Sequence, residues 1–443
     1  MKIGTGLLMK TIGIDIGTTT ISAVVMDTEN KKLLTSRTVA NGSFIQTAYE
    51  WERIQDVNLL IKKAKELLDE LLQQYPDTEA IGLTGQMHGI LYTNKEGQCI
   101  SPLYTWQDGS GDQPEFDGES IAAQITRKYG IFAATGFGLV TCLYHVKKGL
   151  VPEGSVSVCT ISDYLGMCLT GRKSPLLHAS NGASLGFYDT KNWRFQEEMI
   201  ADAGMELSML PEVTADIKEL GTYRGIPVLV SLGDNQASFL GAVGMQENVW
   251  QVNVGTGGQI SVLSEQHFEA SGIEARPFLK KKYILTGAVL CAGRAYAILE
   301  QFFQRYAEAM GIESGEQYGI MEKLARSAKK DAGGIRVVTK FMGTRVNPEL
   351  RGNISGLSEE NFLPENLVLG VIQGIIREFY DIYQEIHLGV GIRAEKLIAS
   401  GNGVRRNEVL QDNLKRMFQT DLEMAAFQEE AACGAALSAL YVE

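Results

Sequence analysis

The chain has 443 residues, which at about 100–200 residues per domain predicts two or three domains. Apolar residues make up 44% and charged residues 21%, which excludes a disordered chain, a fibrous repeat and a disulfide-stapled miniprotein. The net charge of −12 offers no electrostatic footprint for a nucleic-acid backbone or an anionic membrane. A nucleotide remains a candidate ligand, since backbone amides and Mg²⁺ can hold phosphate without bulk positive charge.

The sequence also bears on location. No apolar run reaches the ~18–20 residues that a membrane-spanning helix needs. Gly4 and Gly6 interrupt the apolar patch at the N-terminus, which argues against a signal peptide. A second Met-Lys pair at Met9 suggests that residues 1–8 are an upstream extension. The six cysteines form no C-x-x-C pair and are predicted to be reduced thiols, so we expect a cytoplasmic protein.

The first predicted element is a hairpin over residues 11–26, with apolar residues alternating on both sides of the turn Gly17-Thr18-Thr19. Asp15 lies in its first strand, beside the turn. A helix is predicted over 55–74 because its apolar residues recur at helical spacing. The remaining predictions in this half are strands over 80–84, 157–161 and 226–232, a polar loop over 179–184 and a helix over 236–242.

The second half opens in the same way as the first. An alternating strand over 249–254 leads into the turn Gly255-Thr256-Gly257-Gly258, and a second strand returns over 259–263. This coarse duplication predicts two related α/β domains that divide near Gly241. The later predictions are helices over 294–310, 364–388 (with Gly389 as C-cap) and 407–418, and a strand over 397–399.

The two Gly/Thr turns are the candidate phosphate sites. Neither a Walker loop nor a G-x-G-x-x-G motif is present. A turn rich in Gly and Thr exposes backbone N–H groups and hydroxyls that suit phosphate oxygens. Either turn alone is more often an ordinary hairpin turn, but two of them at equivalent places in duplicated halves favour a phosphate clamp. Aspartate is depleted in strands, so Asp15 beside such a turn is interpreted as a Mg²⁺ site, reached through water; the alternative is a strand-end Asp that bonds the turn.

Asp234 is the second candidate carboxylate. It follows a predicted strand and precedes a predicted helix, the position where α/β proteins bind ligands, although it could instead cap the helix.

Flat polar groups beside an aromatic face suit a polyol ligand. The candidate residues for such a site are Gln86, Met87, His88, Trp106, Asp108, Asp163 and Asn181. A turn at Gly401-Asn402-Gly403 would let backbone approach a ligand closely, or would simply join a strand to a helix.

Seven short segments, in this order, resemble the FGGY carbohydrate kinases of the actin, hexokinase and heat-shock ATPase superfamily. They are Gly13–Thr19, Gly85–Gly89, Trp106–Gly109, Gly233–Ala237, Asn253–Gly257, Gly401–Gly403 with Asn407, and Glu430–Ala436. The likeness spans about residues 11 to 441. Two positions depart from the family pattern: Ser110 stands where an Arg is usual, and Asn402 is the middle of the usual triple glycine.

This resemblance implies two α/β domains of the ribonuclease-H-like type that flank a catalytic cleft. Residues 9–241 would form the domain that mainly binds sugar, and residues 242–443 the domain that mainly binds ATP. ATP and Mg²⁺ are the implied cofactors, and a small-molecule sugar is the implied partner. Neither nucleic acid nor membrane is expected as a partner, and a homodimer is compatible with the resemblance.

The resemblance also implies roles for individual residues. Asp234 would be the general base, and Asp15 and Asp234 would hold Mg²⁺ or its waters. The implied phosphate contacts are Gly17, Thr18, Thr19, Gly255, Thr256 and Gly257, and the implied nucleoside contacts are Gly293, Gly401, Asn402, Gly403 and Asn407. The implied sugar contacts are Gln86, Met87, His88, Trp106, Asp108, Asp163, Asn181, Asp234 and Asn235.

Within the family, the segments are most similar to the kinases of sedoheptulose and next to those of xylulose, so the expected reaction phosphorylates a terminal hydroxyl of a ketose. Kinases of other pentuloses or of gluconate are the alternatives within the family. An ATP-driven machine like the heat-shock ATPases and a sugar-binding pseudokinase are the alternatives outside sugar phosphorylation. The presence of Asp15, Asp234 and both Gly/Thr turns argues against the pseudokinase.

Overall fold

The computed structural model describes residues 10–114, 118–313, 315–344 and 347–443. The chain separates into two compact units. Unit 1 consists of the described residues up to Gly244 together with Arg276–Lys282 and Phe427–Glu443, and unit 2 consists of Met245–Ala275 and Tyr283–Ala426. Within the described ranges, no helix has both the length and the apolar character needed to cross a membrane.

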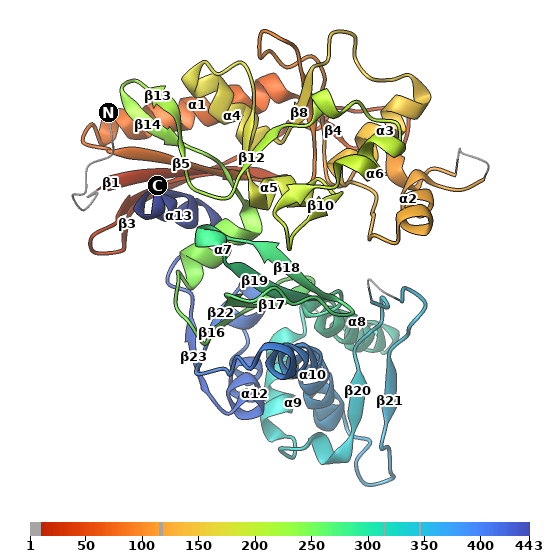
Figure 1. The fold of residues 1–443 in the computed structure, drawn as a ribbon. Helices are drawn as coiled ribbons and strands as arrows, with labels where there is room; N and C mark the ends of the chain where they lie inside the picture. The colour runs from red at the N-terminus through yellow and green to blue at the C-terminus, as the bar shows by residue number, and fades with distance from the viewer. Residues whose placement is uncertain (1–9, 115–117, 314, 345–346) are drawn as a thin grey trace. The chain divides into compact units, whose positions relative to one another are not determined.

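Unit 1 is built on a mixed sheet whose strands run in the order β13-β14-β5-β1-β2-β3, with β15 also paired to β5 (Figure 1). The strands are β1 (Lys10–Ile16), β2 (Thr20–Asp27), β3 (Lys32–Ala40), β5 (Ala80–Gly85), β13 (Glu219–Tyr223), β14 (Ile226–Leu229) and β15 (Leu232–Gly233). β1 runs antiparallel to β2 and parallel to β5. Ile12 stands opposite Val25, and the antiparallel pairing of β1 with β2 confirms the first predicted hairpin.

Helices cover both faces of this sheet (Figure 1). On one face, α1 (Val57–Gln74) turns Leu60, Leu68 and Leu71 into the core. It begins two residues later than predicted because the side chain of Asp56 caps it, accepting the N–H of Leu59 at 3.1 Å. α4 (Ile161–Thr170) also packs on β5, and α13 (Glu430–Leu437), drawn in blue, covers the opposite face.

The packing of α13 on the sheet explains two glycines. A Cβ on Gly13 of β1 would lie 1.9 Å from the carbonyl oxygen of Ala432, and one on Gly82 of β5 would lie 1.8 Å from that of Ala435. Only glycine permits such a close approach. The C-terminal segment therefore completes unit 1, so a single division near residue 241 does not describe the two units of this chain.

Unit 2 repeats the strand order of unit 1. Its sheet runs β18-β19-β17-β16-β22-β23, formed by β16 (Val249–Val254), β17 (Gly258–Ser264), β18 (Ile273–Pro277), β19 (Tyr283–Val289), β22 (Lys396–Ser400) and β23 (Asp421–Met424). The path β19-β17-β16-β22-β23 corresponds to β3-β2-β1-β5-β14, with three antiparallel strands followed by parallel ones. This correspondence confirms the predicted duplication and the ribonuclease-H-like class.

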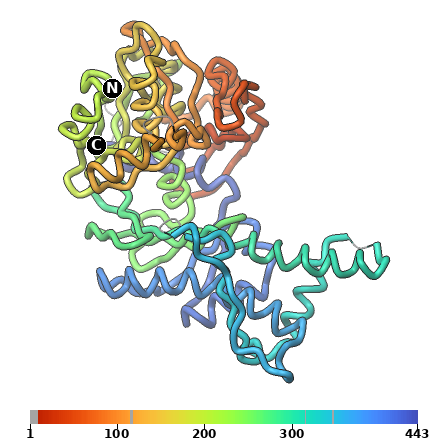
Figure 2. The backbone as a smooth tube through the Cα atoms, turned by 90° about the vertical axis from the view of Figure 1, so that its right-hand side faces the viewer, coloured from red at the N-terminus to blue at the C-terminus, as the bar shows by residue number. Residues whose placement is uncertain are grey.

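The long helix α10 (Pro364–Val390) lies along the sheet of unit 2 (Figure 2). Its Phe379 ring fills the space beside Gly258, 2.4 Å from where a Cβ would stand. The prediction that Gly389 caps this helix is wrong, because the helix continues to Val390 and the C-cap is Gly391, which takes the left-handed conformation at φ 78°. Gly389 instead makes room for the ring of Phe268, 2.2 Å from its Cβ position.

Three further predictions are corrected. The strand predicted over 157–161 ends at Cys159, because Thr160 caps α4 by accepting the N–H of Asp163. The loop predicted over 179–184 is the short helix α5 (Ala179–Ser184), capped by the Nδ1 of His178. The strand predicted over 226–232 is broken into β14 and β15.

Smaller elements complete the two units. Unit 1 also contains α7 (Asp234–Ala242), α2 (Ile121–Tyr129), α3 (Gly138–Lys148), α6 (Glu197–Asp202) and the short strands β4 (Ile54–Gln55), β6 (Leu91–Thr93), β7 (Leu103–Tyr104), β8 (Ser157–Cys159), β9 (Leu176–His178), β10 (Tyr188–Asp189), β11 (Arg194–Phe195) and β12 (Glu212–Thr214). Unit 2 also contains α8 (Gly293–Ala309), α9 (Tyr318–Ser327), α11 (Asn402–Arg405), α12 (Glu408–Phe418), β20 (Arg336–Val338) and β21 (Asn353–Ser355).

Candidate functional site

Two polar side chains stand next to each other at the carboxyl ends of β1 and β5. Asp15 and Thr84 are register partners across these parallel strands. The Oδ1 of Asp15 and the Oγ1 of Thr84 are both buried, and neither has a hydrogen-bond partner among the described residues. Because buried polar atoms in proteins are almost always bonded, this pair of atoms marks a place for a polar ligand or a hydrated cation.

Asp234 is the first residue of α7, and the N-cap position belongs to Gly233. The alternative in which Asp234 caps the helix is therefore wrong. One oxygen of its carboxylate, Oδ1, accepts a bond from Nδ2 of Asn235 at 3.0 Å. Burial raises the pKa of Asp234 to about 6, against the lowering effects of the Asn235 amide and the positive charge of Arg276.

Asp15 and Asp234 are linked electrostatically. Burial raises the pKa of Asp15 to about 7, and the negative charges of Asp234 and Glu429 add to the shift. A cation beside the two carboxylates would relieve their repulsion. Within the described ranges, no group of three or more His, Cys, Asp and Glu side chains could hold a metal by itself. A cation here would depend on water or phosphate for its other ligands, as Mg²⁺ commonly does.

The predicted phosphate turn of unit 1 is fixed by two amide side chains. Nδ2 of Asn41 donates to the carbonyl oxygens of Gly17 at 2.9 Å and Thr18 at 2.6 Å. Nε2 of Gln55 donates to the Thr18 carbonyl at 2.8 Å. With its carbonyl oxygens held in this way, the turn is ordered before any ligand binds.

Two predicted sugar residues lie against this turn. Gln86 is buried, donates from Nε2 to Oε1 of Gln55 at 2.8 Å and accepts the hydroxyl of Thr18 at 3.4 Å. Trp106 donates from Nε1 to the Oγ1 of Thr18 at 2.9 Å. The structure thus brings together residues that were predicted separately for sugar and for phosphate.

His88 is held in an unusual conformation. Its backbone has φ 71°, its N–H donates to the Oγ of Ser184 at 3.2 Å, and its Nδ1 lies 2.7 Å from the Ser184 carbonyl oxygen. A carbonyl oxygen can only accept, so Nδ1 carries the proton. The His88 ring stacks on Phe137 with centroids 4.9 Å apart. Next to it, the buried Met87 receives a bond on its sulfur from Nδ2 of Asn235 at 3.6 Å.

The other three predicted sugar residues are buried and bonded to protein groups. Asp108 accepts the backbone N–H groups of Arg53 and Ser110, both at 3.1 Å. Asp163 accepts the hydroxyl of Thr160 at 2.6 Å and Nδ2 of Asn181 at 3.2 and 3.3 Å. Burial raises the pKa of Asp163 to about 7. The bonds between Asp163 and Asn181 join α4 to α5.

Unit 2 carries a pocket of about 430 Å³ that contains four of the predicted nucleoside residues, Gly293, Asn402, Gly403 and Asn407. Gly401, the fifth, has φ 86°, and a Cβ there would meet the Val254 carbonyl oxygen at 2.5 Å. The pocket is also lined by Tyr296 and Tyr318, whose rings stack with centroids 5.8 Å apart. Sequence reasoning missed both tyrosines, because an aromatic residue on a helix is usually a core residue.

The second Gly/Thr turn is tied to the start of α8. The N–H of Gly293 donates to the Gly255 carbonyl at 3.0 Å, and the N–H of Arg294 donates to the Thr256 carbonyl at 2.9 Å. A Cβ on Gly293 would lie 2.4 Å from that same Gly255 oxygen. The turn is therefore held beside the N-terminus of a 17-residue helix, where backbone dipoles favour anions.

Known protein families match almost the whole chain. The N-terminal domain of the FGGY family of carbohydrate kinases matches residues 10–241, and its C-terminal domain matches residues 251–443. The chain belongs to the FGGY family of carbohydrate kinases. It is a phosphotransferase that acts on a sugar with ATP as the phosphoryl donor, which confirms the prediction of a sugar kinase.

Individual relatives agree with this. The FGGY kinase is 26% identical to sedoheptulokinase from Mus musculus over 474 residues, covering 96% of each chain. It is 24% identical to xylulose kinase from Staphylococcus xylosus, covering 97% of this chain and 90% of the relative. The crystal structure of gluconate kinase from Lactobacillus acidophilus matches with a TM-score of 0.81 at 20% identity, covering 98% and 89%. That of xylulose kinase from Rhodospirillum rubrum gives 0.82 at 20% identity, covering 97% and 89%.

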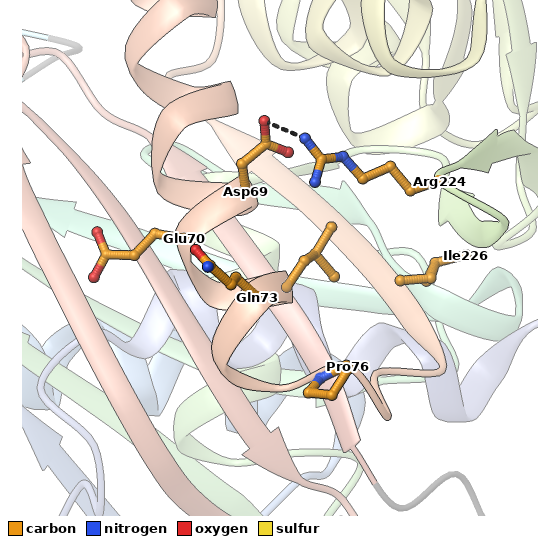
Figure 3. Close-up of a pocket in the computed structure, with 7 residues that line it drawn as sticks. Asp69, Glu70, Gln73, Pro76, Arg224 and Ile226 are labelled. Carbon is orange, nitrogen blue, oxygen red and sulfur yellow. Dashed lines mark ion pairs between the residues drawn. The ribbon is translucent and has the colours of Figure 1, made fainter.

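A larger hollow in the FGGY kinase lies apart from all of these residues (Figure 3). It has a volume of about 580 Å³ and is lined by the end of α1 and the β13–β14 hairpin, including an ion pair between Asp69 and Arg224 at 2.7 Å. Pro76, on its edge, comes just before β5, at the amino end of that strand. Ligands in α/β sheets bind at the carboxyl ends of strands, so this hollow is not the active site.

Proposed function

We propose that the FGGY kinase transfers the γ-phosphoryl group of ATP to a terminal hydroxyl of a ketose, with sedoheptulose preferred to xylulose. The observation that carries the chemistry is the half-buried carboxylate pair of Asp15 and Asp234, next to a Gly/Thr turn that is held by amide side chains. The choice of sedoheptulose as the substrate is supported by two relatives named sedoheptulokinase. They come from Mus musculus, at 26% identity, and from Homo sapiens, at 25% identity, and each match covers 96% of the chain.

Asp234 acts as the general base in this proposal. With a pKa of about 6 it is mainly ionised above neutral pH, and it is basic enough to take the proton from a sugar hydroxyl as the oxygen attacks phosphorus. Phosphoryl transfer through a loose transition state needs little covalent help, so the protein contributes mainly position and charge stabilisation.

Mg²⁺ fits the residues present. The Oδ1 of Asp15 has no partner among the described residues, and burial together with the repulsion from Asp234 raises the pKa of Asp15, so a cation would stabilise the ionised form of this pair. We propose that both carboxylates hold Mg²⁺ through its waters. When bound, the ion supplies neutralisation of the charge that develops on the transferring phosphoryl group.

The nucleotide is assigned to backbone groups and one pocket. The turns Gly17–Thr19 and Gly255–Gly257 would donate N–H groups and hydroxyls to the phosphates. The nucleoside would occupy the pocket of unit 2 between Gly403, Asn407 and the two stacked tyrosines. Flat aromatic faces of this kind suit a nucleobase.

The sugar is assigned to the neighbourhood of Asp234 in unit 1. We propose that His88, Trp106 and Asn235 contact the sugar directly, together with Gln86 and Met87. Asp108 and Asp163 would shape the walls of the sugar site, because their carboxylates already accept hydrogen bonds from the protein. Asn181 donates from Nδ2 to Asp163, while its buried Oδ1 has no partner among the described residues and remains available to a sugar hydroxyl. Ser110 brings no positive charge to this region, which favours a neutral ketose over the carboxylate of gluconate.

A panel of sugars tests the proposal. ADP release from ATP is measured with sedoheptulose, xylulose, ribulose, gluconate and glycerol, and the specificity constants are compared. We expect sedoheptulose to give the highest value and xylulose the next. A higher value for gluconate or glycerol would overturn the ketose assignment while leaving the kinase intact, and ADP release that no acceptor stimulates would overturn the transfer reaction itself.

A further inference from the structure

We propose that Ser180 and His178 are positioning residues that fix the main chain on which Asp234 is carried. The inference rests on the proposed role of Asp234 as the base. Ser180 lies in α5 and His178 immediately precedes that helix, and both side chains are fully buried. Neither residue belongs to the predicted site.

A chain of three hydrogen bonds connects these residues to the active-site turn. The backbone N–H of Gly233, the residue before Asp234, donates to the Oγ of Ser180 at 2.9 Å. The same Oγ lies 2.9 Å from the Nδ1 of His178. At the other side of the ring, the His178 Nε2 lies 3.2 Å from the carbonyl oxygen of Ala215.

Only one arrangement of protons satisfies this chain. The Ala215 carbonyl can only accept, so the Nε2 of His178 carries the proton and its Nδ1 presents a lone pair. That lone pair accepts the backbone N–H of Ser180 at 3.1 Å, and the Ser180 hydroxyl, 2.9 Å away, can only donate into the same lone pair, which leaves its oxygen lone pairs for the Gly233 N–H. The direction of every bond is thereby fixed, and the Ser180 oxygen can be only an acceptor toward Gly233.

The Ser180 bond holds the chain just after Leu232, at Gly233, and a second bond from the same helix holds it just before Leu232, at Ser231. Nδ2 of Asn181 donates to the Ser231 carbonyl at 3.3 Å and is itself held by the carboxylate of Asp163. Two consecutive residues of α5 thus bind two backbone atoms that flank a single residue of β15. This strand end also pairs with β5, where Gly233 is the register partner of Gly85.

The position of Asp234 depends on these two bonds, one from the Gly233 N–H to Ser180 and one from Asn181 to the Ser231 carbonyl, because Gly233 has no side chain of its own. No side chain caps α7, so the Ser180 bond determines how the strand enters the helix. Loss of the Ser180 hydroxyl would leave a buried N–H unpaired and free the turn to shift. A displacement of about 1 Å in a catalytic group can cost roughly a hundredfold in rate.

The experiment compares Ser180→Ala with Ser157→Ala in the full-length enzyme. Ser157 is a matched control, since it is a buried serine of unit 1 whose hydroxyl bonds only backbone carbonyls. We expect Ser180→Ala to lower kcat by about 10- to 100-fold while the KM for ATP stays within about twofold. Ser157→Ala should keep kcat within about twofold, and Ser180→Thr, which retains the hydroxyl, should recover most of the rate.

Ser180→Cys separates the loss of the hydrogen-bond acceptor from the loss of the fold. Its near-identical size preserves packing while its sulfur is a weak acceptor, so we expect a loss of at least about fivefold in kcat from a folded protein. Thermal unfolding establishes that each variant is folded. A folded Ser180→Ala or Ser180→Cys enzyme with kcat within about twofold of wild type would overturn the proposal, as would an equal loss in Ser157→Ala.

A double-mutant cycle separates this inference from the proposed function. If Ser180 acts through Asp234, its substitution should change kcat by no more than about twofold in an Asp234→Asn background. An unchanged effect of Ser180→Ala in that background would overturn the positioning role. If Asp234→Asn alone keeps kcat within about tenfold of wild type, the base assignment fails, whatever Ser180 does.

Discussion

Trp106 donates its indole N–H to the hydroxyl of Thr18 across 2.9 Å, although 46% of the Trp106 residue surface remains exposed. The bond joins the loop assigned to the sugar with the turn assigned to phosphate. The two segments are therefore connected directly by this hydrogen bond. The Thr18 hydroxyl makes two hydrogen bonds, since it accepts the indole N–H and also donates to Oε1 of Gln86.

This bond can be removed while the aromatic face is kept. In Trp106→Phe we expect kcat to fall by about fivefold, the equivalent of one hydrogen bond, with a smaller change in sugar KM. Trp106→Ala should also raise the sugar KM, because the ring face is lost, and should leave the ATP KM unchanged. Steady-state kinetics measures both. Trp193→Phe is the control, because Trp193 lies in the turn between β10 and β11 and belongs to none of the assigned sites, so its kinetics should match wild type. Equal kinetics for Trp106→Phe and wild type would contradict a role for the N–H.

Asp234→Asn tests the general base. We expect kcat to fall by about 10²–10⁴-fold, because the amide cannot accept the hydroxyl proton. ATP affinity, measured by calorimetry, should change little, since the nucleoside pocket belongs to unit 2. Asp202→Asn is the matched control: Asp202 is an exposed residue paired with Lys128 at 2.6 Å, and its loss should leave kcat within about twofold.

The rate should depend on pH through the same carboxylates. A base with a pKa of about 6 beside a group with a pKa of about 7 must lose its proton before it can act. We expect kcat/KM for the sugar to fall as the pH drops through 7 to 6. Higher Mg²⁺ should move this acid limb to lower pH, because the cation favours the ionised carboxylates. A kcat/KM that stays constant between pH 5 and 8 would contradict both the predicted fall at acid pH and its predicted shift with Mg²⁺.

Asp15→Asn should stabilise the fold at alkaline pH while it removes activity. The folded pKa of Asp15, about 7, lies above its unfolded value of about 4, so the folded state binds more protons between these limits. The free energy of unfolding contributed by this group therefore falls as the pH rises through that window. Without Mg²⁺, the Tm difference between Asp15→Asn and wild type should be larger at pH 8 than at pH 5.

Asp27, a partly exposed residue at the end of β2, provides a control of opposite sign. Bonds from Asn30 lower its pKa, so its stabilising contribution is present at neutral pH and is lost as the pH falls. Asp27→Asn should therefore reduce the Tm slightly at pH 8. A lower Tm for Asp15→Asn than for wild type at pH 8 would show that the ionised Asp15 carboxylate does not destabilise the folded state.

Gly293→Val tests the second phosphate turn. The added side chain would collide with the Gly255 carbonyl, 2.4 Å from the Cβ position, and push the turn from the start of α8. We expect the ATP KM to rise at least about tenfold with the sugar KM unchanged. Gly315→Ala, at a glycine with nothing within 4 Å of its Cβ position, should leave both constants unchanged. An unchanged ATP KM in Gly293→Val would remove this turn from the nucleotide site.

Local patterns in the sequence were sufficient for much of the fold and for part of the site. Alternation around Gly17-Thr18-Thr19 predicted β1 and β2, and the same pattern around the second turn predicted β16 and β17. Asp15 was identified because a carboxylate is unusual inside a strand. These features are encoded by neighbours in the chain, so period and turn chemistry are enough to find them.

Long-range packing decided the rest. The return of α13 to unit 1 depends on Gly13 and Gly82, whose need for close approach is visible only when the helix is in place. The bonds from Gln55 to Thr18 and from Gly233 to Ser180 join residues 37 and 53 positions apart, and no local pattern marks either one. A buried polar side chain acquires its role from the partner that folding brings to it, and that partner is set by the tertiary structure alone.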